Sequence, residues 1–369
     1  MPRHLFLPDR VWRRDGTGGY APCDRSAEPE RWLAAAYADE PLITRFANGR
    51  PSSSASMPSM VARMLLLVGL AGPVAESEPA GGRERVLELG AGTGFNAGLL
   101  CALVGEDAVT TVEVDPLLAR QAEENLKTVG FAPAVVHGDA ADAVDTVDAV
   151  GEGFFDRILA TFSVDRVPPA WLSQTRRGGR IVTPWMSAWC SYGTLALTVG
   201  GDGRDSGDGR DSAAQGRFHP FASFMPMATS AEAAPVATEV SHAAPARSTS
   251  TLSPWTVAGG DLDAEFHVGL AVPGASFAWD TSGRQAHTRL DIADDTSGSW
   301  ATVDYDGRTS THFTVTQSGP RALWGEIAAA YGQWEGLGRP TVDRYGLSVG
   351  VDGSAHLWLD SPATVVTAI

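Results

Sequence analysis

The sequence predicts an α/β protein, in which a mainly parallel sheet with helices on both faces is preceded by an N-terminal extension and followed by a smaller C-terminal α+β domain. Three observations predict this. Apolar runs alternate with helical segments from about residue 84 to residue 184, as is typical of parallel sheets with right-handed crossovers. A glycine-rich turn follows the first of these runs. A segment rich in Ala, Ser, Thr and Pro then precedes short β-rich runs near the C-terminus.

The N-terminal extension is expected over residues 1–52, with one helix over 29–38 that begins near acidic residues. The central domain, expected over 53–227, begins with a helix from Pro58 to about residue 70, because proline is favoured in the first turn of a helix. Its apolar runs predict strands at 85–89, 109–114, 134–136, 157–160, 180–183 and 192–199, and helices at 95–104, 116–129 and 169–175.

Two segments are expected to lack regular structure. The hexapeptide Gly-Asp-Gly-Arg-Asp-Ser occurs twice in tandem, at 201–206 and 207–212, and predicts a solvated loop. Residues 228–257 are expected to be a linker because they are rich in Ala, Ser, Thr and Pro.

The separate C-terminal α+β domain is expected over residues 258–369. Its helix, at 320–335, carries apolar residues at the spacing of a core-facing stripe. Strands are expected at 266–272, 287–292, 300–305 and 312–316, and two further strand-like runs follow the helix.

The composition argues against several classes of partner. With 28 Lys and Arg against 44 Asp and Glu, the net charge of −16 disfavours binding to nucleic acids or to anionic membranes. The three cysteines, Cys23, Cys101 and Cys190, are far apart, so neither disulfides nor a metal site is expected. No signal peptide and no membrane-spanning run is evident, so we expect a cytoplasmic protein with a small-molecule or peptide partner.

The most informative segment is Val-Leu-Glu-Leu-Gly-Ala-Gly-Thr-Gly-Phe at 86–95. Its glycines let backbone approach a ligand closely, and the N-terminus of the following helix offers free N–H groups. Alone, the pattern also fits dinucleotide binding, phosphate binding or a simple tight turn. However, the carboxylate of Glu88 would repel a pyrophosphate and could pair with a cation, unless it is merely a solvated strand end. The absence of Lys and Arg from the turn counts against a P-loop.

Further acidic residues are expected at the same edge of the sheet. Glu113 ends the next strand, where an acid can bind both hydroxyls of a ribose. Asp139 follows the third strand, where it would meet an adenine amino group or form an Asx turn. A ligand with a ribose, an adenine and a positive charge but no phosphate fits these residues, and S-adenosylmethionine has those parts. The expected cofactor-binding residues are Glu88, Gly90, Gly92, Gly94, Glu113, Val114, Gly138, Asp139 and Ala140.

Residues from about 51 to 227 resemble the protein-L-isoaspartate O-methyltransferases. Ser-Ala-Ser-Met-Pro-Ser-Met-Val-Ala at 54–62 is similar to the family's Thr-Ile-Ser-x-Pro segment, and Gly-Asp-Ala at 138–140 to its Gly-Asp-Gly. The glycine turn, Glu113, residues 155–161, residues 178–184 and the closing Phe-Met-Pro at 224–226 also match the family's pattern. The resemblance implies a Rossmann-like, S-adenosylmethionine-dependent enzyme that methylates a carboxylate and releases S-adenosylhomocysteine.

Several residues depart from the family's pattern. A serine cluster occupies 52–56, Phe162 and Ser163 stand where the family has alanines, and Ala140 replaces a glycine. The chain also continues for over a hundred residues beyond the closing pattern. In these features the chain resembles a branch of the family whose members act in the biosynthesis of graspetides, which are ribosomally made peptides. The resemblance implies that the enzyme methylates a normal aspartate in a precursor already cyclised by an ATP-grasp ligase, after which the ester closes to an aspartimide.

The resemblance also implies roles on the substrate side. Ser56 is expected to orient the attacking carboxylate, with Ser53, Ser54 and Thr161 as supporting donors and Phe162 in the substrate site. Since Ser56 precedes the helix expected at residue 58, helix capping is the alternative. An aspartate side chain, with a pKa of about 3.9, is anionic at neutral pH, so neither a catalytic base nor a metal is expected.

Two other functions remain open. One is the repair of isoaspartate in proteins, and the other is a non-catalytic S-adenosylmethionine-binding module whose working part is the C-terminal domain. In the biosynthetic interpretation, that domain is expected to pack beside the serine segment and to form part of the peptide-binding wall. Its candidate aromatic residues are Trp279, Trp300, Tyr305, Phe313 and Trp358.

Overall fold

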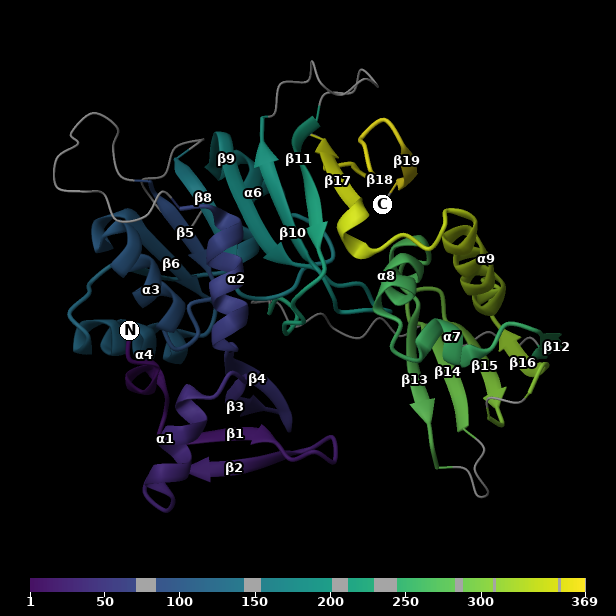
Figure 1. The fold of residues 1–369 in the computed structure, drawn as a ribbon, viewed down its shortest axis with the longest axis horizontal. Helices are drawn as coiled ribbons and strands as arrows, with labels where there is room; N and C mark the ends of the chain where they lie inside the picture. The colour runs from purple at the N-terminus through teal and green to yellow at the C-terminus, as the bar shows by residue number, and fades with distance from the viewer. Residues whose placement is uncertain are drawn as a thin grey trace.

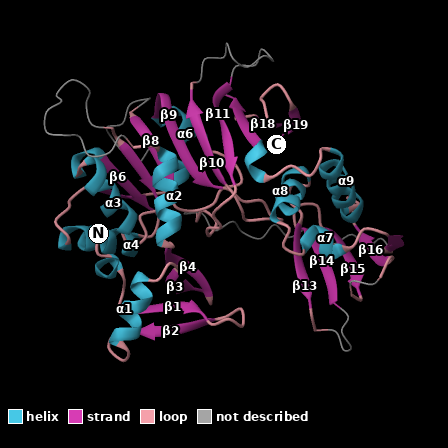
Figure 2. Ribbon diagram, viewed as in Figure 1, coloured by secondary structure: helices cyan, strands magenta, loops and turns pink. Residues whose placement is uncertain are grey.

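The computed structural model describes residues 1–70, 84–142, 154–200, 212–228, 244–282, 288–307, 310–350 and 353–368. Nearly all of the tandem hexapeptide and residues 229–243 of the expected linker lie outside these residues. The described residues form three sheets, and helices pack on each of them (Figures 1 and 2).

The N-terminal region is a small antiparallel sheet with a helix, whereas the sequence predicted the helix alone. Its elements are β1 (Arg10–Arg14), β2 (Tyr20–Asp24), α1 (Pro29–Tyr37), β3 (Leu42–Ala47) and β4 (Arg50–Ala55). The strand order is β2-β1-β3-β4, and Trp32 of α1 is buried with Leu42 of β3. Strand β4 contains Ser53 and Ser54, so the boundary expected after residue 52 falls inside a strand.

The central sheet has ten strands in the order β19-β18-β17-β11-β10-β9-β8-β5-β6-β7. Its strands are β5 (Val86–Leu89), β6 (Val109–Glu113), β7 (Ala134–His137), β8 (Phe155–Ala160), β9 (Thr175–Pro184), β10 (Thr194–Val199), β11 (Ser212–His219), β17 (Tyr345–Gly350), β18 (Ala355–Leu359) and β19 (Val365–Ala368). Strands β9, β8, β5, β6 and β7 are parallel, and the others pair antiparallel. The parallel part confirms the predicted Rossmann-like sheet.

Helices cover both faces of the central sheet, as predicted. They include α2 (Pro58–Val68), α3 (Phe95–Val104), α4 (Pro116–Thr128) and α6 (Pro169–Gln174). On one face, Met64 of α2 packs against Leu159 of β8, and Leu100 of α3 packs in the cluster that contains Val86 of β5. On the other face, Trp171 of α6 is buried with Leu87 of β5. The side chains of Val86 and Leu87 therefore point to opposite faces of the sheet, as strand alternation requires.

The third sheet lies in the C-terminal region and is antiparallel. The elements of this unit are β12 (Ala246–Ser250), α7 (Pro254–Ala258), α8 (Leu262–Ala271), β13 (Ser276–Asp280), β14 (Thr288–Asp294), β15 (Ser299–Tyr305), β16 (Phe313–Ser318) and α9 (Leu323–Gly336). The strand order is β12-β16-β15-β14-β13, and Ile327 of α9 is fully buried in its core.

The architecture of the C-terminal region differs from the expected one in three ways. Residues 266–272, expected to form a strand, belong almost entirely to helix α8. Because this helix is buried on nearly all sides, its apolar residues form a continuous run, and such a run does not distinguish a helix from a strand. The end of the expected linker instead forms β12 and α7. Strands β17, β18 and β19 extend the central sheet from β11, so residues 258–369 are not one separate unit.

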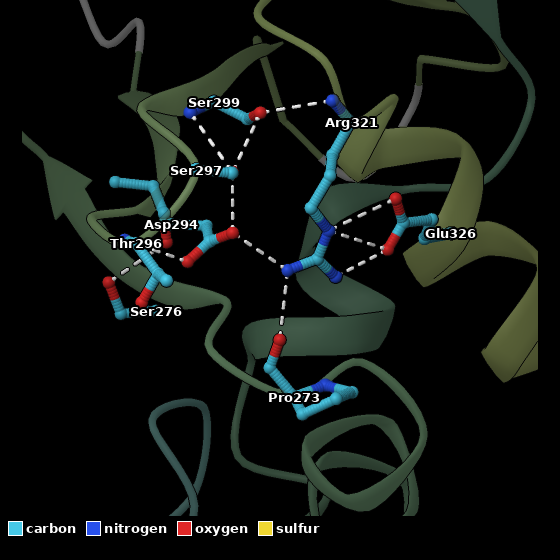
Figure 3. A network of polar contacts seen from close by, with 9 residues as sticks. Pro273, Ser276, Asp294, Thr296, Ser297, Ser299, Arg321 and Glu326 are labelled. Carbon is cyan, nitrogen blue, oxygen red and sulfur yellow. Dashed lines mark hydrogen bonds and ion pairs between the residues drawn. The ribbon is translucent and has the colours of Figure 1, made fainter. Parts of the chain in front are cut away.

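A polar network joins the turn after β14 to the start of α9 (Figure 3). The guanidinium of Arg321 donates to the buried carboxylate of Asp294 over 2.9 Å, to the carbonyl of Pro273 over 2.9 Å, and to Glu326. Ser297 Oγ donates to the same Asp294 oxygen over 2.5 Å. This network satisfies a carboxylate that would otherwise be costly to bury, and it fixes α9 on its sheet.

Two features are absent from the residues that the structure describes. Within those ranges, no helix is both long and apolar enough to cross a membrane. The same residues contain no group of three or more His, Cys, Asp or Glu arranged to hold a metal ion.

Candidate functional site

The glycine turn lies between β5 and α3, at the carboxyl edge of the parallel strands. Gly90, Gly92 and Gly94 have φ values of 92°, 54° and 87°, in the left-handed region that favours glycine. A Cβ on Gly90 would lie 2.5 Å from Thr161 Oγ1, whereas a Cβ on Gly92 would meet nothing within 4 Å. The turn is thus closed on the side of β8 and open at Gly92, which leaves room for a ligand beside the backbone.

Glu113, the last residue of β6, is joined to this turn. Its Oε2 accepts from the backbone N–H of Gly92 over 2.8 Å, and its Oε1 accepts from that of Asp115 over 3.1 Å. The residue is only 7% exposed, and burial raises its pKa above the ordinary value for a glutamate. An anionic carboxylate can accept more than two hydrogen bonds, so Glu113 retains acceptor capacity for the hydroxyls of a ribose.

Glu88 has a different position from the expected one, because it does not line the cleft. It is fully buried, and its carboxylate accepts from Asn96 Nδ2 over 2.7 Å and from Thr111 Oγ1 over 2.5 Å. Burial raises the pKa of Glu88 to about 7. Glu88 therefore connects the start of α3 to β6 beneath the glycine turn, and its carboxylate faces the core rather than the cleft in which a ligand cation was expected.

A cleft of about 1030 Å³, including space open to solvent, lies above the turn. Besides Glu88, two expected residues lie outside its lining. Gly94 faces α4, where a Cβ would come within 3.1 Å of the Ala122 carbonyl, and Asp139 accepts from the Ala141 N–H over 2.9 Å in an Asx turn. The expected residues that do line the cleft are Ser53, Ser54, Ser56, Gly90, Gly92, Glu113, Val114, Gly138, Ala140, Thr161 and Phe162.

The serine segment, residues 52–56, also lines the cleft. Ser53 is buried, and its Oγ accepts from Thr44 Oγ1 over 2.9 Å. Met57, not Ser56, occupies the N-cap position of α2, and no side chain of the cap residue bonds to the helix. Asp39 Oδ1 instead accepts from the N–H of Ser59 over 2.9 Å. The helix-capping alternative for Ser56 is therefore wrong.

Thr161 and Phe162 connect the end of β8 to the turn. Thr161 Oγ1 donates to the carbonyl of Gly90 over 2.6 Å, so its proton is engaged with the turn rather than offered to a substrate. The ring of Phe162 lies 6.1 Å from that of Trp171 and forms part of the apolar wall.

Several other residues of the lining carry no signal of such a role in the sequence. Val61 and Met64 of α2 and Leu118 of α4 are apolar residues on helices that also face the core, so periodicity could not single them out. Met225, in the family's closing pattern, is placed by a hydrogen bond of 2.8 Å from the Ser163 N–H to its carbonyl. The pattern itself was visible, but its proximity to the cleft depends on this long-range contact.

None of the described residues after Ala228 lines the cleft. The C-terminal unit packs instead on the loop after β9 and on the end of β11, where Trp189 Nε1 donates to the Val257 carbonyl over 3.0 Å and Phe218 contacts Phe266. Figure 1 shows its five-stranded sheet far from α3, α4 and β4. The expectation that this unit packs beside the serine segment and forms a wall of the cleft is not supported for the described residues.

The geometry defines a class of protein. A parallel strand, a glycine turn with open space beside it, a helix, and an acid at the end of the next strand form the adenosine-binding arrangement of Rossmann-like proteins, a class that includes the S-adenosylmethionine-dependent methyltransferases. The chain shares this arrangement, and its residues fit the cofactor, because Gly92 leaves room for it and Glu113 has free acceptor capacity.

The family follows from sequence comparison. The family model for protein-L-isoaspartate(D-aspartate) O-methyltransferase (PCMT) matches residues 23–189. A protein-L-isoaspartate O-methyltransferase of Anaeromyxobacter dehalogenans strain 2CP-1 is 37% identical over 186 residues, which are 50% of this chain and 78% of that protein. The chain therefore belongs to the protein-L-isoaspartate O-methyltransferase family.

Other relatives are matched over less of their length. A Thermotoga maritima protein-L-isoaspartate O-methyltransferase is 32% identical over 154 residues, 41% of this chain and 44% of that protein. The enzyme numbered 2 from Shewanella sediminis is 30% identical over 203 residues, 55% of this chain and 66% of that protein. The chain thus spans about half to two thirds of these relatives. One solved protein-L-isoaspartate O-methyltransferase has a TM-score of 0.49 and 20% identity, covering 97% of this chain and 92% of that one.

Proposed function

We propose that this protein transfers the methyl group of S-adenosylmethionine to a side-chain carboxylate of a peptide or protein. The observation that carries the proposal is that the glycine turn with Glu113 and the serine segment line one and the same cleft. A cofactor at the turn and an acceptor at the serines would thus lie within the same cleft, as methyl transfer requires.

The bound cofactor would supply an activated methyl group, and the acceptor carboxylate is already an anion at neutral pH. The chain's own residues therefore orient the acceptor and exclude water, and none has to act as a base. The hydroxyls of Ser54 and Ser56 would hold one carboxylate oxygen while the other attacks. The side chains of Val61, Met64 and Phe162 line the same space and would keep water away from the reacting atoms.

We further propose that the acceptor is a normal aspartate in a cyclised, ribosomally made peptide, modified beforehand by an ATP-grasp ligase. After methylation, the backbone nitrogen of the next residue attacks the ester carbonyl; a C–N bond forms and methanol leaves, giving an aspartimide. The departures at Phe162 and Ala140, which both line the cleft, support an acceptor different from that of the repair enzymes. Repair of isoaspartate is the second candidate, and the names of the relatives favour it.

A panel of acceptors tests the proposal. The protein is incubated with S-adenosylmethionine and three versions of one peptide: linear with Asp, linear with isoaspartate, and cyclised through side-chain esters or amides with Asp. Mass spectrometry should find the cyclised peptide 14 Da heavier and then 18 Da lighter than the starting peptide, as the ester forms and closes. Turnover of the isoaspartyl peptide alone would favour repair, and no turnover of any acceptor would leave a non-catalytic binding module.

A further inference from the structure

Arg3 stands out because its charge is buried and no carboxylate among the described residues is hydrogen-bonded to it. The residue is 2% exposed, and its guanidinium donates five hydrogen bonds, all of them to backbone carbonyls. Burial lowers its pKa, and the nearby carboxylates of Glu40 and Asp39 raise it. Since an arginine stays protonated in proteins, the carbonyl dipoles must stabilise this charge.

The five carbonyls belong to two segments that are distant in sequence. Nη1 donates to Ala36 over 3.1 Å and to Ala38 over 3.3 Å, at the end of α1, and Nη2 donates to Glu40 over 3.2 Å. Nη2 also donates to Ala55 over 3.1 Å and to Ser56 over 2.9 Å. One planar group therefore joins the end of helix α1 to the connection between β4 and α2.

This connection is the part of the serine segment at which the acceptor is proposed to bind. Both Ala55 and Ser56 line the cleft, and their carbonyls point to Arg3. Among the strands that the structure describes, β4 pairs only with β3 and is therefore an edge strand, so the position of its other side depends on further contacts. Arg3 supplies two such contacts, and its positive charge lies 2.9 Å from the Ser56 carbonyl, on the wall that would receive an anion.

We propose that Arg3 is a positioning residue for methyl transfer: it fixes the backbone of Ala55 and Ser56 so that the serine hydroxyls hold the acceptor carboxylate. This inference rests on the proposed function of the cleft. Lysine cannot replace it, because an ammonium donates from a single nitrogen, whereas the guanidinium distributes its five bonds over two nitrogens held in one plane.

The test compares two variants with a control. Arg3→Lys keeps the charge without the fork, and Arg3→Met removes both. Arg10→Lys is the matched control, because Arg10 lies in β1 of the small sheet whose strand β4 bonds to Arg3, and it pairs with Asp24 at the surface. For each protein we measure kcat and KM for the acceptor peptide, affinity for S-adenosylhomocysteine, thermal stability, and amide hydrogen exchange over residues 53–60.

We expect kcat of Arg3→Lys to fall about 10- to 100-fold, as for a small misplacement of a reacting group, while affinity for S-adenosylhomocysteine stays within twofold. Exchange over residues 53–60 should become faster in both Arg3 variants and stay unchanged in the control. Unchanged kcat and exchange would overturn the inference, and so would unfolding of both variants, which would make Arg3 a residue of the general fold. If the wild-type protein methylates no acceptor, the proposed function fails, and the exchange data still decide whether Arg3 fixes the segment.

Discussion

Glu113→Gln tests the cofactor site most sharply, because the substitution keeps the size of the side chain and removes its charge. Both carboxylate oxygens already accept from the backbone, at Gly92 and at Asp115. An amide has one acceptor oxygen, so its NH₂ group would face one of these two N–H donors. The variant therefore loses one backbone contact and, at the same time, its charge-assisted bonds to the ribose hydroxyls.

The expected loss follows from these bonds. Hydrogen bonds to a charged group contribute about 1.5–3 kcal/mol, so we expect a loss of about 2–3 kcal/mol in binding of S-adenosylhomocysteine. This corresponds to a dissociation constant about 30- to 150-fold higher. Because burial raises the pKa of Glu113, the wild-type affinity should be full above that pKa and fall as the pH drops through it. The affinity of the variant should not show this dependence.

Isothermal titration calorimetry with S-adenosylhomocysteine between pH 5 and 8.5 measures both effects. Glu123→Gln is the matched control, because Glu123 lies on the exposed side of α4 and pairs only with Lys127 at the surface. Its affinity should equal that of the wild type. A dissociation constant of Glu113→Gln within twofold of the wild-type value at pH 8 would refute the assignment of Glu113 to the cofactor.

Three further outcomes are expected. Ser56→Ala should lower kcat about 10- to 100-fold with unchanged melting temperature and cofactor affinity, since it does not cap α2; a parallel loss of stability would contradict this. Glu88 has a folded pKa of about 7, above its unfolded value, so its contribution to stability is full at pH 4 and is lost as the pH rises to 7; denaturation of Glu88→Gln against pH should lack this slope, and parallel curves would exclude it. A chain ending at Pro254 loses β17–β19 and exposes the edge of β11, so scanning fluorimetry should show a lower melting temperature, and an unchanged one would contradict the sheet order.

The parallel part of the central sheet was predictable because its signals are local. Helix α3 spans the predicted residues, and the strand expected at 109–114 is observed as Val109–Glu113. In each case apolar periodicity, proline or glycine marks the boundary within the segment itself. The glycine turn and Glu113 could likewise be placed at one edge, since parallel strands end on the same side.

The remaining features depend on contacts between distant residues. Strands β1 and β2 carry polar and charged residues, so no apolar run in the sequence predicts them. They are stabilised by pairing within the small sheet. Strand β17 pairs with β11 although more than a hundred residues separate them in sequence. The composition of the chain between them does not indicate this pairing. The orientation of Glu88 was also hidden, because alternation places it opposite Leu87 but does not show that α3 and Thr111 cover that face.

The central claim is that this cleft transfers a methyl group from S-adenosylmethionine to a carboxylate. Its most direct measurement uses S-adenosylmethionine labelled in the methyl group and quantifies both products in one reaction with an Asp-containing cyclised peptide. We predict equal amounts of S-adenosylhomocysteine and of label that is released as methanol, either on closure to the aspartimide or on treatment with base. Intact S-adenosylmethionine at the end of the reaction, or label in a base-stable linkage, would contradict the account.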